Sequence, residues 1–174
     1  MTSPSTLLSP GVVRLERLLP GPVDRVWDYL VDSEKRATWL AAGEWDLRVG
    51  GAIRMTPDNN RLSRDKNAPE AYRKNGGKVV TGVITRLEPK RLVAHTWTWQ
   101  DLDSEVTYEL TPRGKDVLLV IVHRALQPRQ VVLGVMAGWD VHTGILEDVL
   151  RGVEPRPYWA EWAKLEKQYS PAVP

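Results

Sequence analysis

Hydrophobic and polar positions at the start of the chain predict a strand followed by two short helices. Apolar and polar residues alternate incompletely over residues 12–19, as they do in a strand at a sheet edge. After a turn at residues 20–22, apolar residues recur with helical spacing at Val23, Val26, Trp27 and Leu30. A cap at Asp32 or Ser33 predicts a second short helix that runs towards Trp39.

Segments of alternating polarity then predict an antiparallel sheet. Apolar residues at alternate positions lead into Gly50-Gly51 and continue to Met55, which is typical of a tight hairpin. Further strands are expected over residues 79–87, 92–99, 104–110 and 117–123, with short turns between them. The polar stretch 57–77 precedes these strands, and a loop of this length is either mobile or functional.

The last third of the chain predicts two helices. A wide apolar stripe from Val132 to Val149 indicates a helix of about twenty residues that stops near Gly152 and Pro155. We expect the glycines inside this helix to allow a close approach to the sheet or a bend; they are Gly134, Gly138 and Gly144. Apolar residues at helical spacing over 158–169 predict a short tail helix that packs on the body.

This order of elements predicts an α+β fold of the helix-grip (START-like) kind. We expect a curved antiparallel sheet of about six or seven strands wrapped around a long C-terminal helix, with two short helices after the first strand. Residues 1–10 are expected to be a flexible N-terminal tail, and residues 11–170 a single domain. A cavity is expected where the long helix covers the concave face of the sheet.

Composition limits the functional classes. The chain has 174 residues, and its 24 basic and 22 acidic side chains are too evenly balanced to indicate a nucleic-acid partner. No cysteine is present, which excludes disulfides and thiolate metal sites, and neither a secretory signal nor a membrane span is apparent. We therefore expect a cytoplasmic protein. Phenylalanine is absent, whereas there are eight tryptophans and five tyrosines.

A set of short segments, taken in order, points to a known family. They are Val23-Asp24-Arg25-Val26-Trp27, Arg36-Ala37-Thr38-Trp39-Leu40, Arg48-Val49-Gly50-Gly51, Gly82, Leu87-Glu88-Pro89, Thr96-Trp97, Ser104-Glu105-Val106-Thr107, His123 and Gly138-Trp139. Over residues 11–169 the sequence resembles the SRPBCC or START-like superfamily, in particular its bacterial branch similar to the C-terminal domain of the activator of the heat-shock-protein-ninety ATPase. This resemblance implies a fold whose members bind lipids, sterols, polyketides or other apolar molecules, and sometimes cyclise or dehydrate polyketides.

Ring-bearing side chains on the central strands and on the long helix are the candidates for lining the cavity. A pocket of rings with a few polar tips is the usual composition of a small-molecule site, and core packing is the alternative role for the same residues. The candidates are Trp39, His95, Trp97, Trp99, Val106, Tyr108, Met136 and Trp139.

The remaining motifs give little support to catalysis. The three histidines, His95, His123 and His142, lack the spacing of a metal site, so we expect no metal and no cofactor, although one of them could act as a general acid or base. Nucleophile-elbow, phosphate-loop and dinucleotide-binding motifs are missing. An excess of three positive charges over residues 58–78 fits a solvated loop, or an anionic partner or ligand head group at the cavity mouth.

These observations favour a protein that binds a small hydrophobic ligand, either lipid-like or aromatic and polyketide-like, as a non-catalytic carrier or sensor. Two alternatives remain open. One is an enzyme of the cyclase or dehydratase kind, in which His95 or Tyr108 transfers a proton to or from a polyketide-like substrate. The other is a co-chaperone-like protein-interaction module; a protein partner or a homodimer also remains open.

Overall fold

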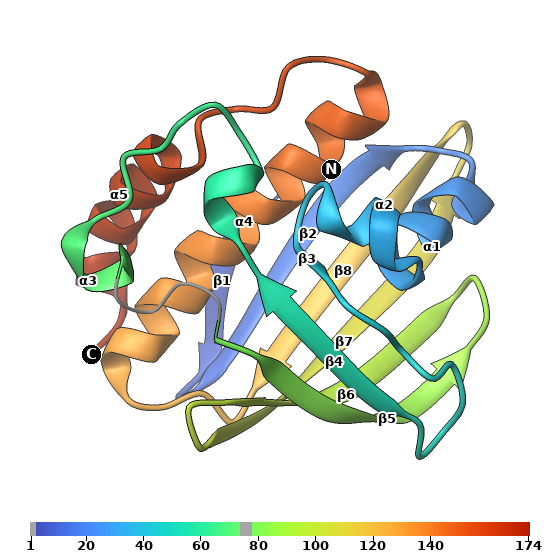
Figure 1. Ribbon diagram of the computed structural model, residues 1–174, viewed down its shortest axis with the longest axis horizontal. Helices are drawn as coiled ribbons and strands as arrows, with labels where there is room; N and C mark the ends of the chain where they lie inside the picture. Colours follow the sequence, from blue (N-terminus) through green and yellow to red (C-terminus); the bar gives the residue numbers. More distant parts are fainter. Residues whose placement is uncertain (1–2, 74–77) are drawn as a thin grey trace.

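A curved antiparallel sheet and a long helix across its concave face make up the main layers of the computed structural model, which describes residues 3–73 and 78–174 (Figure 1). The strands are β1 (Ser3–Ser9), β2 (Val12–Pro20), β3 (Ala41–Ala42), β4 (Ala52–Pro57), β5 (Val80–Glu88), β6 (Leu92–Trp99), β7 (Leu102–Arg113) and β8 (Asp116–Arg124). The helices are α1 (Val23–Val31), α2 (Ser33–Ala37), α3 (Glu70–Arg73), α4 (Arg129–Arg151) and α5 (Tyr158–Tyr169), with 3-10 turns η1 (Asn59–Arg61) and η2 (Ser170–Ala172).

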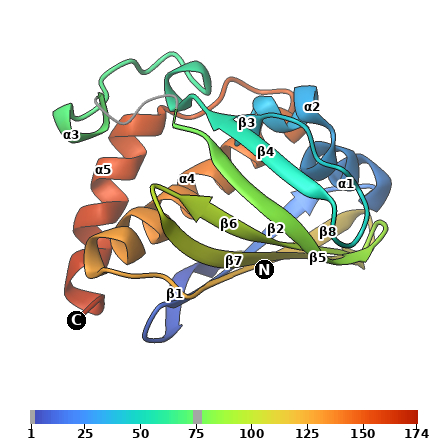
Figure 2. The ribbon, with the colours of Figure 1, turned by 60° about the horizontal axis from the view of Figure 1, so that its bottom comes forward.

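The sheet has the order β1-β2-β8-β7-β6-β5-β4-β3, and its strands curve around α4 (Figure 2). Side chains alternate between the two faces, so that every second residue of β2 and β8 is buried. In this register Val13 lies opposite His123, at the end of β8 nearest to α4 in the chain. The α+β helix-grip fold expected from the sequence is thus confirmed, with eight strands rather than six or seven.

The N-terminal segment differs from the expected flexible tail. Ser3–Ser9 form strand β1, which pairs antiparallel with β2. Two hydrogen bonds tie β1 to α4: the Ser5 N–H donates to a carboxylate oxygen of Asp140 at 2.9 Å, and the Ser5 hydroxyl donates to the carbonyl oxygen of Met136 at 3.0 Å. Because these contacts are polar, the hydrophobic pattern of residues 3–9 does not predict a strand.

The expected hairpin at Gly50-Gly51 is also different. Residues 44–46 do pair antiparallel with residues 52–54, through the Trp45–Ile53 bridge and backbone hydrogen bonds at 2.9 and 3.0 Å, but residues 47–51 form a wider loop than a tight Gly-Gly turn. A Cβ atom on Gly51 would lie 1.9 Å from the carbonyl oxygen of Asp46. Glycine is therefore required at position 51 because the backbone of Asp46 lies too close to leave room for a side chain.

The polar stretch 57–77 is docked on α5 where the structure describes it, and residues 74–77 lie outside the described residues. The Ser63 hydroxyl accepts the Tyr158 N–H at 3.0 Å, and a carboxylate oxygen of Asp65 accepts the Ala160 N–H at 2.9 Å. Both N–H groups belong to the first turn of α5, where a helix leaves its donors without intrahelical partners. The loop thus caps α5 from a distance in sequence.

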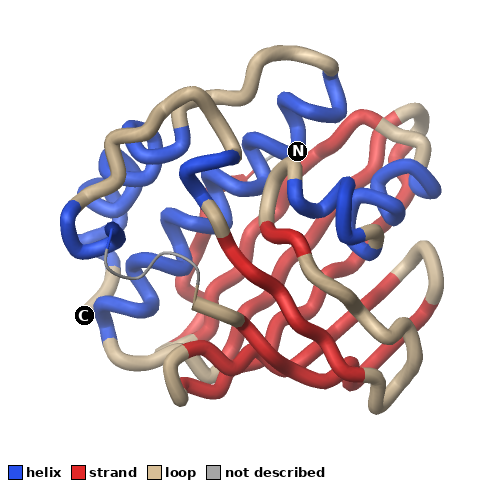
Figure 3. Tube along the Cα trace, viewed as in Figure 1, coloured by secondary structure: helices blue, strands red, loops and turns tan. Residues whose placement is uncertain are grey.

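Helix α4 ends at Gly152, which adopts the left-handed conformation, as the sequence predicts. It packs against β1, β2 and α5, while α1 lies against β7 and β8 (Figure 3). Among residues 3–73 and 78–174, no helix combines the length and apolar character needed to cross a membrane.

Arg36 joins the two short helices to the edge of the sheet. Its side chain is fully buried and donates hydrogen bonds to the carbonyl oxygens of Leu30, Val31, Ala41 and Gly43. Its guanidinium also lies 4.3 Å from the ring centre of Trp45. Burial lowers the pKa of Arg36 to about 10, so it remains charged at neutral pH.

Replacing Arg36 by methionine is expected to lower the free energy of unfolding by about 3 kcal/mol, because several buried carbonyl groups lose their donors. Arg36→Lys should recover only part of this loss, since an ammonium cannot span the same carbonyls. Urea unfolding measures both effects, and Arg25→Met, an exposed change on α1, is the matched control. A loss no larger in Arg36→Met than in the control would contradict the assignment.

Candidate functional site

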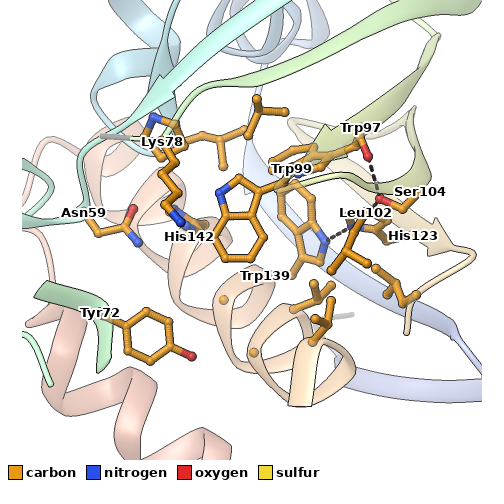
Figure 4. Close-up of a pocket in the computed structure, with 18 of the residues that line it drawn as sticks. Asn59, Tyr72, Lys78, Trp97, Trp99, Leu102, Ser104, His123, Trp139 and His142 are labelled. Atoms are coloured by element: carbon orange, nitrogen blue, oxygen red, sulfur yellow. Dashed lines mark hydrogen bonds between the residues drawn. The ribbon is translucent and has the colours of Figure 1, made fainter. Parts of the chain in front are cut away.

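A cavity of about 460 Å³ lies between α4, α5, the segment after β4 and the ends of the central strands (Figure 4). Its lining is rich in aromatic rings, which are Tyr72, Trp97, Trp99, Trp139, Tyr158, Trp159 and Trp162. Exposed residues such as Asn60 and Gln130 also belong to the lining, so the cavity opens to solvent on this side. A small molecule can therefore enter it and contact several rings at once.

Two glycines of α4 leave space for this cavity. Gly134 and Gly138 are both lining residues, and a Cβ atom added at either would meet no atom closer than 3.5 Å. The expected close approach to the sheet is therefore not their role. Gly144 is different, because a Cβ there would lie 2.5 Å from the Arg156 guanidinium, which packs over the helix.

A directed chain of hydrogen bonds fixes the wall formed by α4, β8 and β7. The Trp139 indole N–H donates to Nδ1 of His123 at 3.1 Å, so that Nδ1 must carry no proton. Nε2 of His123 then donates to the Ser104 hydroxyl at 2.8 Å, and this hydroxyl donates to the carbonyl oxygen of Trp97 at 3.1 Å. Both ring nitrogens of His123 are thus occupied by the protein itself.

A second chain starts one turn further along α4, at His142, and leads to Tyr158 of α5 and Asn59 of η1. Nδ1–H of His142 donates to the carbonyl oxygen of Trp39 at 2.7 Å, which leaves Nε2 as an acceptor for the Tyr158 hydroxyl at 3.3 Å. The Tyr158 oxygen in turn accepts the side-chain N–H of Asn59 at 2.9 Å. The direction of this chain places the amide oxygen of Asn59 at its end, where it is buried without a hydrogen-bond partner in the described part of the chain.

The two histidines of the cavity wall are neutral at physiological pH. Burial, together with the nearby His95, lowers the pKa of His123 to about 3, and burial lowers that of His142 to about 4. The pKa of His95 is lowered by burial to about 4 as well. None of the three is therefore poised to exchange protons near neutral pH.

Three of the eight residues expected from the sequence line the cavity: Trp97, Trp99 and Trp139. The other five lie in the core behind the wall and are at most 1% exposed: Trp39, His95, Val106, Tyr108 and Met136. The rings of Tyr108 and Trp139 make an edge-on contact at 5.8 Å, so the inner layer of rings supports the outer one.

A small cluster of unpartnered polar groups lies within this inner core. Trp45, His95 and Tyr108 each keep a buried polar atom without a hydrogen-bond partner among the described residues. The ring centres of Trp45 and His95 are 4.9 Å apart, and those of His95 and Tyr108 are 5.7 Å apart. These groups are separated from the cavity by the layer that contains Trp97 and Trp139.

Sequence reasoning missed several lining residues, chiefly His123, His142 and Tyr158, and it considered Lys78 only as part of the basic stretch 58–78. The alternation of β8 carries a signal for His123, since it shares the inner face with Ile121. For Tyr158 no local signal exists, because the position of α5 depends on the distant loop that caps it. Within residues 3–73 and 78–174, no three histidine or carboxylate side chains come together as a metal site.

Comparison with solved structures confirms the fold. A protein from Bordetella parapertussis, solved by solution NMR, shares 37% identity with a TM-score of 0.78, over 97% of this chain and 94% of that one. CalU16 from Micromonospora echinospora, in its crystal structure, shares 20% identity with a TM-score of 0.70, over 98% of this chain and 96% of that one. A crystal structure from Mesorhizobium loti shares 22% identity with a TM-score of 0.66, over 82% and 98% of the two chains.

Comparison with curated proteins gives no match. The sequence model of one family, described as Activator of Hsp90 ATPase homolog 1-like protein, matches residues 20–151. This range runs from the end of β2 to the end of α4 and leaves β1 and α5 outside it. The resemblance noted in the sequence is thereby confirmed: the chain belongs to the family of Activator of Hsp90 ATPase homolog 1-like proteins.

Proposed function

We propose that this protein binds a small, apolar, ring-containing molecule in the cavity between α4 and the sheet, as a carrier or sensor without a chemical step. The observation that carries the proposal is the cavity itself, about 460 Å³ in volume and lined mainly by aromatic and aliphatic side chains. Family membership agrees with ligand binding but leaves the ligand unassigned.

The aromatic lining of the cavity suits a ligand that contains rings. Burial of apolar surface contributes about 25 cal/mol per Å², before the cost of association is subtracted. Rings such as Trp97, Trp99 and Trp159 add offset or edge-on contacts to an aromatic guest. Because their neighbours hold the wall residues in place, the ligand need not order them on binding.

The wall supports binding better than catalysis. Both ring nitrogens of His123 and His142 are engaged with protein groups, and His95 and Tyr108, the residues of the enzymatic hypothesis, lie outside the lining. A cyclase or dehydratase needs a group that can transfer a proton to the substrate. The co-chaperone hypothesis has no comparable support from the site. We also propose a cytoplasmic location, in keeping with a chain that lacks cysteine.

Filling the cavity from α4 tests the proposal without weakening the fold. In Gly138→Leu the new side chain enters the cavity, so the affinity for naphthalene-2-carboxamide should fall at least about ten-fold. The variant should be no less stable than the wild type, because leucine is favoured over glycine inside helices by roughly 0.8 kcal/mol. Isothermal titration calorimetry measures the affinity, and urea unfolding measures the stability.

The matched control is Gly138→Ala, which gives a similar helix propensity but adds only one methyl group. Its affinity should stay within about three-fold of wild type. If Gly138→Leu binds as tightly as Gly138→Ala, the ligand does not occupy this cavity and the proposal fails.

The neutral histidines predict how stability depends on pH. Each histidine has a lower pKa in the folded protein than in the unfolded chain, so the unfolded chain binds more protons between pH 6.5 and about 4. Stability is therefore full above pH 6.5 and falls as the pH is lowered through this window, by about 1.4 kcal/mol per pH unit for each buried histidine.

His142→Asn removes one of these groups and keeps a donor near the position of Nδ1. We expect the slope of unfolding free energy against pH, measured by urea unfolding between pH 5 and 6.5, to decrease by about a third. The slope is informative even if the variant is less stable at every pH. An unchanged slope would mean that His142 titrates normally in the folded protein.

A further inference from the structure

Lys78 occupies an unusual position at the cavity. It comes two residues before Val80, the first residue of β5, whose side chain is buried. Because side chains alternate along an extended chain, Lys78 lies on the same side of the chain as Val80, at the mouth of the cavity, where it remains exposed to solvent. Lys78 is a lining residue, and Figure 4 shows its side chain reaching into the cavity towards His142.

The ammonium of Lys78 has no hydrogen bond or ion pair within residues 3–73 and 78–174. Most other basic side chains near this loop do have a partner. Arg64 pairs with Glu154 at 2.8 Å, and Arg73 donates to the carbonyl oxygen of Ala68 at 2.9 Å. Lys78 thus carries a solvent-exposed charge at the cavity mouth that no group in the described part of the chain binds.

Other polar groups gather at the same end of the cavity. Figure 4 shows Asn59, Tyr72 and Lys78 on one side, and Trp97, Leu102 and Trp139 on the other. The amide oxygen of Asn59 is buried without a hydrogen-bond partner in the described residues. At the opposite end the Trp139 indole, His123 and Ser104 satisfy one another. The ammonium of Lys78 and the amide oxygen of Asn59 thus lie away from the wall in which Trp139, His123 and Ser104 satisfy one another.

The acids of the lining do not neutralise Lys78. Asp103 is the second residue of β7, opposite Thr98 of β6, and its carboxylate accepts the Thr98 hydroxyl at 2.6 Å. Asp58 follows Thr56 on the alternate, exposed side of the chain after β4, and no ion pair joins it to Lys78. His123 and His142 are neutral and add no charge. Lys78 is the cationic residue of the described lining.

We infer that the ligand is an aromatic carboxylic acid, bound with its rings among Trp97, Trp99 and Trp139 and its carboxylate against the ammonium of Lys78. This inference rests on the proposed function, because it assigns a ligand class to the same cavity.

The test compares two probes of the same shape, naphthalene-2-carboxylate and the neutral naphthalene-2-carboxamide, by calorimetric titration at pH 7. Wild type should bind the carboxylate about five-fold more tightly than the amide. Lys78→Met, which keeps most of the aliphatic stem, should remove this preference and leave the amide affinity within about two-fold. Lys78→Arg should keep the preference, because it keeps the charge.

The control is Lys115→Met, in the turn between β7 and β8, which lowers the net charge equally and leaves the lining unchanged. It should retain the carboxylate preference. If wild type binds both probes equally, or if Lys78→Met retains the preference, the inference is overturned while the proposed function stands. If wild type binds neither probe, the proposed function itself fails, and the inference fails with it.

Discussion

The hydrogen bond from the Trp139 indole to His123 joins the middle of α4 to the inner face of β8, and the rest of the site depends on it. It sets the tautomer of His123, and this tautomer directs the ring's remaining N–H to Ser104 on β7. These hydrogen bonds thereby hold α4, β8, β7 and the end of β6 in one arrangement. The same bond holds the large Trp139 ring against the sheet, so that the glycines on its own helix leave open space beside it.

The cavity exists because α4 does not pack closely on the sheet along its whole length. Contacts elsewhere along the helix hold it in place. Helix α4 packs on β1 and β2, where Arg17 of β2 forms a buried ion pair with Asp140 at 3.2 Å. Asp140 also accepts hydrogen bonds from Ser5 and from the Tyr169 hydroxyl, so one carboxylate joins β1, α4 and α5. Because α4 is fixed along this side, it can stand away from the sheet at Gly134 and Gly138 without loosening. Helix α4 is thus tightly packed on one side and borders the cavity on the other.

The sequence was sufficient for the elements whose stability comes from apolar periodicity, such as α4 and the strands from β5 to β8. It was insufficient where polar contacts across long sequence distances decide the structure. Strand β1 depends on Ser5 meeting α4, and α5 depends on Ser63 and Asp65 capping its first turn. At the site, aromatic content predicted Trp97, Trp99 and Trp139 as lining residues, and the structure places all three at the cavity. Aromatic content could not distinguish these lining residues from Tyr108 and His95 in the core, because rings of both layers lie at alternating strand positions.

The central claim is that an aromatic molecule occupies this cavity, and the eight tryptophans of the chain allow it to be tested in one experiment. Each indole N–H gives a separate signal in a nitrogen–proton correlation spectrum. Addition of naphthalene-2-carboxamide should shift the signals of the lining residues Trp97, Trp99, Trp139, Trp159 and Trp162, and leave those of Trp27, Trp39 and Trp45 in place. Shifts confined to the second group, or no shifts at a saturating concentration, would contradict the account.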